Sequence, residues 1–182
     1  MSQQHDPWQR TAEALDTTYS SNRMKGTSQG TDYGAAYSRG GRYELSSFQL
    51  RIACRSSCTF AIALETSVDR LSKRWGISQE IQTGDRAFDD AYYLSTEQPR
   101  VLAVFLRNAD TRDTIRALFQ LGYTMIKQTG ATLVAEWAPF ELNERFTPEL
   151  VTGTVAHLAK LVAQLAAVEP SVLHEWGSLF GV

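Results

Sequence analysis

The amino-acid sequence predicts an α+β protein with a mainly antiparallel sheet. Runs of β-branched and aromatic residues are separated by short glycine-containing turns, and amphipathic helices stand near both ends of the chain. Strands and helices do not alternate strictly, as they would in a parallel α/β fold. The 182 residues fit one domain that can bury a core without metal or disulfide support. We therefore expect a single domain over 1–182, with 1–5 as a flexible tail.

The N-terminal part predicts a helix followed by a hairpin. Asp6 can cap the helix, and Pro7 can occupy its first position, where the missing N–H is harmless. An apolar stripe then recurs at spacings of four, three and four residues, formed by Trp8, Ala12, Leu15 and Tyr19. The stretch MKGTSQGTDYG (24–34) predicts two strands joined by a turn. Its glycines lack the flanking strand and helix of a phosphate-binding loop, so nucleotide binding is not expected there.

Two further runs, 42–54 and 58–66, predict another hairpin, with RSS as its turn. In that hairpin Cys54 and Cys58 would face each other, and their thiols could oxidise. The alternative is that both are small apolar residues kept reduced in the cytoplasm. Their spacing matches neither a redox dithiol nor a zinc-ligand set.

The middle of the chain predicts short elements. Residues 67–76 indicate one or two helical turns ending at Gly76, and 77–84 and 90–94 indicate strands. The helix that follows has a capping-box spacing and a proline in its first turn, provided by Ser95, Gln98 and Pro99.

The C-terminal part carries the strongest patterns. A helix over 108–122 has Asp110 as its expected cap, Gly122 as its terminator, and an inward face formed by Ile115, Leu118 and Phe119. A hairpin over 123–137 turns at Thr129-Gly130. A long helix over 147–168 is capped by Thr147 and begins at Pro148, and its apolar stripe consists of Val151, Val155, Leu158, Val162 and Leu165. A last short helix, 171–180, is expected after Pro170.

Charge and hydropathy exclude some classes of protein. The net charge is −2 and no stretch is strongly basic, which argues against nucleic acid as a partner. We see no window near the ~20 apolar residues of a membrane span and no secretory signal. The expected localisation is cytoplasmic, with membrane attachment only through an anchor outside this chain.

The segment IQTGDRAFDDAYYL (81–94) is the main candidate site, because a glycine turn carries three carboxylates before two tyrosines. A short carboxylate beside a glycine can bind backbone amides and hold a turn, so the structural motif is predicted to be Gly84, Asp85 and Phe88. The alternative is ligand binding by Asp85, Asp89, Tyr92 and Tyr93. The run lacks the spacing of a calcium loop, and paired acid–base carboxylates need a buried group with a raised pKa. We predict no catalytic residue, no metal and no cofactor, and we interpret His157 as a boundary residue of the long helix.

The same residues resemble a pattern found in certain uncharacterised bacterial soluble domains. In that pattern a T/S-G-(D/N)-x-x-F-D core follows a β-rich half and precedes helices, and 80–106 is the region of greatest similarity. Gly84, Asp85, Phe88 and Asp89 match the pattern, whereas Leu94 stands where valine is commoner. The resemblance implies no known chemistry. It also implies that such a domain can be the soluble part of a membrane-anchored protein.

Three hypotheses for function follow. The first is a non-enzymatic interaction or regulatory module that self-associates as a homo-oligomer or binds a protein partner; it rests on small residues along the long helix, at Gly153, Ala156, Ala159, Ala163 and Ala166. The second is a small-ligand-binding domain with a pocket between sheet and helices, lined by Tyr92, Tyr93, Trp75 or Trp137. The third is a hydrolase that uses Asp85 and Asp89.

Overall fold

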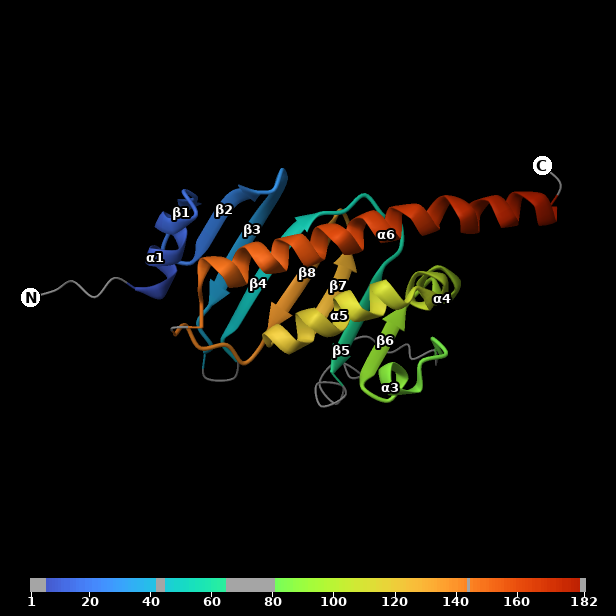
Figure 1. Ribbon diagram of the computed structural model, residues 1–182, viewed down its shortest axis with the longest axis horizontal. Helices are drawn as coiled ribbons and strands as arrows, with labels where there is room; N and C mark the ends of the chain where they lie inside the picture. Colours follow the sequence, from blue (N-terminus) through green and yellow to red (C-terminus); the bar gives the residue numbers. More distant parts are fainter. Residues whose placement is uncertain (1–5, 42–44, 65–80, 144, 181–182) are drawn as a thin grey trace, which may run out of the picture.

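A computed structural model of the protein describes residues 6–41, 45–64, 81–143 and 145–180, with side chains as far as residue 168. Eight strands form one sheet in the order β1-β2-β3-β4-β8-β7-β5-β6, and every neighbouring pair is antiparallel. Helices α4, α5 and α6 lie across one face of this sheet (Figure 1). The α+β prediction is confirmed. The described elements are α1 (Pro7–Ala14), β1 (Thr18–Tyr19), β2 (Arg23–Ser28), β3 (Thr31–Ser38), β4 (Ser47–Ala53), β5 (Phe60–Leu64), α3 (Arg86–Asp89), β6 (Tyr92–Thr96), α4 (Pro99–Arg107), α5 (Ala109–Leu121), β7 (Met125–Thr129), β8 (Thr132–Trp137) and α6 (Pro148–Phe180).

Two of the predicted hairpins are present. Strands β2 and β3 are joined by Gln29 and Gly30, which both have positive φ, as in the tight turns that suit twisted hairpins. Strands β7 and β8 pair from Met125↔Glu136 to Thr129↔Thr132. Their connecting residues are therefore Gly130 and Ala131, one residue later than predicted.

The predicted hairpin between 42–54 and 58–66 is wrong. Strand β4 pairs with β8 and strand β5 pairs with β7, so the β7–β8 hairpin lies between them in the sheet. The connection passes the tip of that hairpin, where the Cys54 amide donates to the Ala131 carbonyl at 2.9 Å. Cys54 and Cys58 are both buried. Both runs do form strands, but a local pattern carries no information about a hairpin inserted from later in the chain.

The helix starts follow the sequence in part. The Asp6 carboxylate accepts a hydrogen bond from the Trp8 amide, as expected of a cap. Helix α1 ends at Ala14, however. Tyr19 lies in β1 with 40% of its surface exposed, so Tyr19 is not part of the buried stripe. Helix α6 begins as predicted, with the Thr147 hydroxyl accepting from the Leu150 amide.

Two predicted caps are replaced by neighbours. Gln98 stands at the cap position of α4 and Pro99 begins the helix, but Ser95 lies in β6, so no capping box forms. The cap of α5 is Asn108, whose side chain accepts from the Asp110 amide at 3.0 Å. In both cases the end of the neighbouring strand or helix is shifted by up to three residues from the expected place, so a different residue occupies the cap position.

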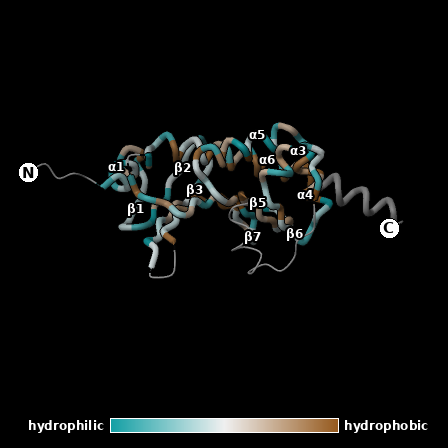
Figure 2. Tube along the Cα trace, turned by 90° about the horizontal axis from the view of Figure 1, so that it is seen from below, coloured by the Kyte–Doolittle hydropathy of each residue, from teal (hydrophilic) through white to brown (hydrophobic). Residues whose placement is uncertain are grey.

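The core lies between the helices and the sheet, as two layers in Figure 2. At one end Phe48 of β4 contacts the rings of Trp8, Phe140 and Phe146 at centroid distances of 6.4, 5.2 and 5.2 Å. At the other end the buried face of α5 is as predicted: Ile115, Leu118 and Phe119. The buried stripe of α6 consists of Val151, Val155, Leu158, Leu161 and Leu165, with Val162 only half-buried.

Helix α6 continues through Pro170 to Phe180 as one helix, so the predicted break at Pro170 is absent. A proline inside a helix removes one hydrogen bond and can kink the helix without ending it. Within the described residues, Pro148–Val168 is long and apolar enough to cross a membrane, with a mean hydropathy of 1.4. The prediction that no window reaches this level is wrong, and 33% of the window is buried inside the described structure.

Other predictions lie partly outside the described residues. The helical turns over 67–76, and with them Gly76 and Trp75, fall there, as does the first half of the strand predicted over 77–84. Residues 81–84 are described and form no strand.

Candidate functional site

The segment 81–94 forms a helical turn fixed by its own side chains. Gly84 has a φ of +83°, the left-handed conformation that glycine adopts most easily. Asp85 caps α3 and accepts from the Phe88 amide at 3.1 Å. Asp89 closes the turn from its other end, because its carboxylate accepts from the amide of Thr83 at 3.0 Å and from its hydroxyl at 2.7 Å. The predicted structural motif is therefore present.

Two arginines of α5 also bind Asp85, and sequence analysis did not predict them. Arg112 Nε and Arg116 Nη2 lie 3.1 and 2.5 Å from Asp85 Oδ2. Arg112 Nη1 donates in addition to the carbonyls of Leu106 and Arg107, at the end of α4. Asp85 thus links the α3 turn to the junction of α4 and α5.

These contacts determine the chemistry of Asp85. The hydrogen bond from Arg116, followed by the bond from the Phe88 amide, lowers the pKa of Asp85 to about 2, from a usual value of 3.8. A carboxylate held in its ionised form is a poor general acid and a weak base near neutral pH. The arrangement indicates a structural carboxylate and disfavours the hydrolase hypothesis.

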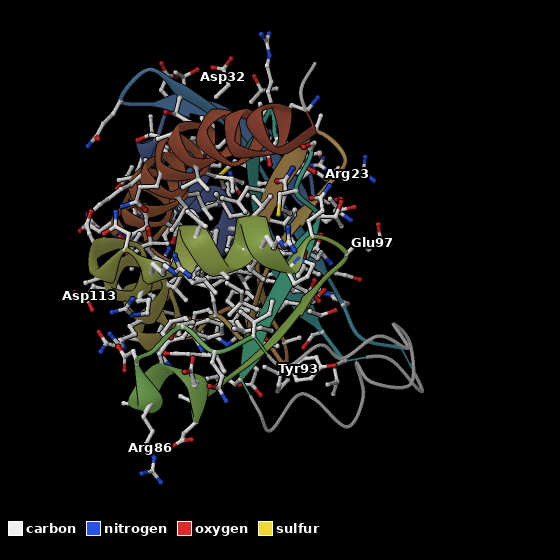
Figure 3. The ribbon with its side chains drawn as sticks, turned by 90° about the vertical axis from the view of Figure 1, so that its right-hand side faces the viewer. Arg23, Asp32, Arg86, Tyr93, Glu97 and Asp113 are labelled. Carbon is white, nitrogen blue, oxygen red and sulfur yellow. The ribbon has the colours of Figure 1, made fainter. Side chains whose placement is uncertain are left out.

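The candidate ligand-binding residues do not converge on one cavity. Tyr92 faces the helices, where its ring lies 4.6 Å from Phe88 and 4.7 Å from Phe119, measured between centroids. Tyr93 pairs with Ala63 and lies on the opposite face of the sheet, on the side away from the helices in Figure 3. Asp89 is engaged by Thr83. The aromatic rings therefore fill the space in which a pocket between sheet and helices was expected.

Trp137 likewise belongs to the core. Its ring lies 5.2 Å from Phe140 and 6.1 Å from Tyr123, and the Arg145 guanidinium lies 5.1 Å from its centroid. A depression of about 300 Å³ does occur at the other end of the molecule. It is lined by Pro7, Arg10, Thr11 and Ala14 of α1 and by 146–149 at the start of α6.

Other titratable groups add little chemistry. His157 is half-buried, and desolvation, followed by the nearby charge of Lys160, lowers its pKa. This agrees with a boundary residue that is neutral at physiological pH. In the described part of the chain, no three His, Cys, Asp or Glu side chains are grouped so that they could hold a metal ion.

We expect Asp85→Asn to lower the melting temperature by several degrees at neutral pH, because asparagine can cap α3 but cannot pair with the two arginines. The folded protein binds the Asp85 proton less tightly than the unfolded chain does. The stabilisation is therefore complete above about pH 4 and is lost as the pH falls toward 2. Denaturant titrations of parent and variant across this range should show the difference shrinking. Asp85→Ala should melt lower still; a variant that melts no lower than the parent while losing an activity would contradict the structural role.

Comparison of the chain with family models, curated proteins and solved structures found no match. The resemblance of 80–106 to uncharacterised bacterial domains therefore stays a prediction.

Proposed function

We propose that the protein is a non-enzymatic interaction module that binds a protein partner through the open face of its sheet, the side of β2, β3 and β4 that the described helices leave exposed. The observation that supports this is the asymmetry of the sheet: α4, α5 and α6 lie on one face, and side chains such as Arg23 and Tyr93 project from the other (Figure 3). Burial alternates along β4 in agreement with this asymmetry. Phe48, Leu50 and Ile52 are buried on the helical side, whereas Arg51 and Ala53 are exposed on the other. An exposed sheet face without a cavity suits a macromolecular partner better than a small ligand.

The two alternatives have less support. A small-ligand site would need space between sheet and helices, where Phe88, Tyr92 and Phe119 are in ring contact. A hydrolase would need Asp85 and Asp89 to act together, but each carboxylate is bound by a different set of donors. The contacts of Asp85 and Asp89 instead hold the α3 turn and connect it to α5.

The proposal can be tested by site-specific photo-cross-linking in cells. A photoreactive residue at Ala53, on the open face, should yield a discrete cross-linked partner. The matched control carries the same residue at Arg107, which is exposed at the end of α4 on the helical side. Equal products from both positions, or none from Ala53, would contradict the proposed surface. Loss of a measured hydrolytic activity in Asp85→Asn would favour the alternative.

Self-association is a second candidate function, and it is favoured by the outer side of α6. Ala156, Ala163 and Ala166 are exposed there, and a Cβ added at Gly153 would meet nothing within 4 Å. Packing against the chain's own sheet therefore does not require a small residue at position 153.

We expect the purified protein to form a dimer or larger oligomer at high micromolar concentration, measured by light scattering. Ala163→Glu, which places a charge on the outer side of α6 without touching its buried stripe, should shift the mass toward the monomer. Ala53→Glu, on the open face of the sheet, is the matched control and should leave the mass unchanged. A monomer mass for the parent at high concentration would exclude self-association.

A further inference from the structure

The open face of the sheet carries a group of cations whose positions follow from strand register. Lys25 of β2 pairs with Gly34 of β3, and Gly34 pairs with Arg51 of β4, so the three positions form one row across the sheet. Arg23 belongs to the adjacent row, two residues from Lys25 along the same strand. We name Arg23, Lys25 and Arg51 the β2–β4 cationic patch.

Gly34 shapes the middle of this patch. A Cβ at position 34 would lie 3.1 Å from Arg51 Nε and 3.5 Å from Arg51 Cγ. The arginine side chain therefore lies across the backbone of β3, in space that only glycine leaves open. In this position the guanidinium lies between β2 and β4, on the same side as Lys25.

The three cations are exposed and have no anionic partner of their own. Within the described residues, no carboxylate lies in ion-pair range of Arg23, Lys25 or Arg51. Lys127, farther along the same face, is different, because it is 2.9 Å from Glu136. Gln49 also donates to that carboxylate, at 3.1 Å, so Glu136 is occupied by neighbours outside the patch. Asp32 of β3 lies on the same face, two residues from Gly34, and accepts a hydrogen bond from the Thr27 hydroxyl at 2.6 Å. Among the described residues, nearby carboxylates therefore offset the positive charge of the patch in part, but none forms an ion pair with it.

We propose that the β2–β4 cationic patch binds an extended, acidic segment of a partner protein. The inference rests on the proposed interaction function and adds the chemistry of the partner. Arg23 and Lys25 are two residues apart on one strand, so their Cα atoms are roughly 7 Å apart, and Lys25 and Arg51 are separated by two strand spacings, roughly 10 Å. An extended peptide presents alternate side chains at the same ~7 Å repeat, so carboxylates at every second residue match Arg23 and Lys25.

Overall charge favours a protein partner over nucleic acid. Proteins that bind nucleic acid neutralise a series of phosphates and usually carry a basic surface, whereas this chain has a net charge of −2. A few exposed cations on an otherwise acidic protein direct an acidic segment to one place and repel it elsewhere.

The experiment measures fluorescence anisotropy of a labelled peptide in which Glu alternates with Thr. The folded parent should bind it, and the affinity should fall as salt is raised. Arg51→Glu should weaken binding about threefold and Lys25→Glu/Arg51→Glu about tenfold, as expected for exposed charge contacts. Arg107→Glu makes the same change of charge on the helical side and should leave the affinity unchanged. Arg51→Gln provides a second variant, with a smaller perturbation of β4, and should also weaken binding.

Several outcomes would overturn the proposal. These are no binding to the parent, equal binding of a peptide with Gln in place of Glu, an equal loss in Arg107→Glu, or tighter binding of a single-stranded oligonucleotide than of the acidic peptide. Photo-cross-linking at Ala53 distinguishes failure of the acidic-segment proposal from failure of the proposed interaction function. A partner captured at Ala53 without acidic-peptide binding would reject only the partner chemistry.

Discussion

Phe88→Ala is expected to lower the free energy of unfolding by ~3–5 kcal/mol, the usual cost of truncating a buried phenylalanine. Phe88 has no exposed surface, although it lies in a helix of only four residues. Its ring contacts Tyr92 at 4.6 Å and lies under the Arg116 guanidinium at 5.4 Å, measured to the ring centroid. The alanine variant loses both contacts and leaves a cavity between α3 and α5.

Thermal and denaturant unfolding can measure this effect, with a decrease in melting temperature of roughly 10 °C for a chain of this size. Arg86→Ala is the control, because Arg86 lies in the same short helix and its side chain is 95% exposed. The control should change the melting temperature little. Similar losses for both variants would mean that α3 itself, and not the burial of Phe88, supplies the stability.

Gly122→Ala is expected to cost about 3 kcal/mol or more, for two reasons. The residue ends α5 with a φ of +113°, where a residue with a Cβ is strained by ~1–3 kcal/mol. The added Cβ would also lie 2.5 Å from Trp137 Cζ2, so the indole ring of β8 would have to move. Forcing extra volume into a packed core typically costs ~1–3 kcal/mol more.

Gly130→Ala separates these two contributions. Gly130 also has positive φ, at +56°, but a Cβ there would meet nothing within 4 Å. This control should show only the backbone cost, as a smaller loss of stability in the same denaturant titration. If both variants lose the same stability, the contact between Gly122 and Trp137 contributes nothing.

Sequence patterns predicted the features that neighbouring residues decide. The Asp6 and Thr147 caps, the β2–β3 turn and the inward face of α5 each depend on a few adjacent positions. The Gly84–Asp85–Phe88 motif belongs to the same class. Local rules were less reliable at boundaries, where Asn108 replaced Asp110 as the cap of α5.

The features that the sequence did not predict depend on residues far apart in the chain. Arg112 and Arg116 reach Asp85 across 27 and 31 residues, and nothing in their own spacing identifies the partner. In the same way, which face of the sheet is open depends on which face the helices cover. Lys25 and Arg51 lie on one surface because both strands are in register with Gly34, and the sequence alone does not show this register.

The place of the β7–β8 hairpin has a consequence for synthesis of the chain. Strands β1 to β4 and strands β5 and β6 leave the ribosome first, but no pairing joins β4 to β5 until Met125–Trp137 arrives. Before that point the native pairs can form at most two separate sheets, each with an unpaired edge where β7 and β8 will lie. Unpaired edges are templates for association with other chains. Any truncation before Met125 therefore removes the two strands that unite the sheet, and it leaves the edges of β4 and β5 available to form aggregates.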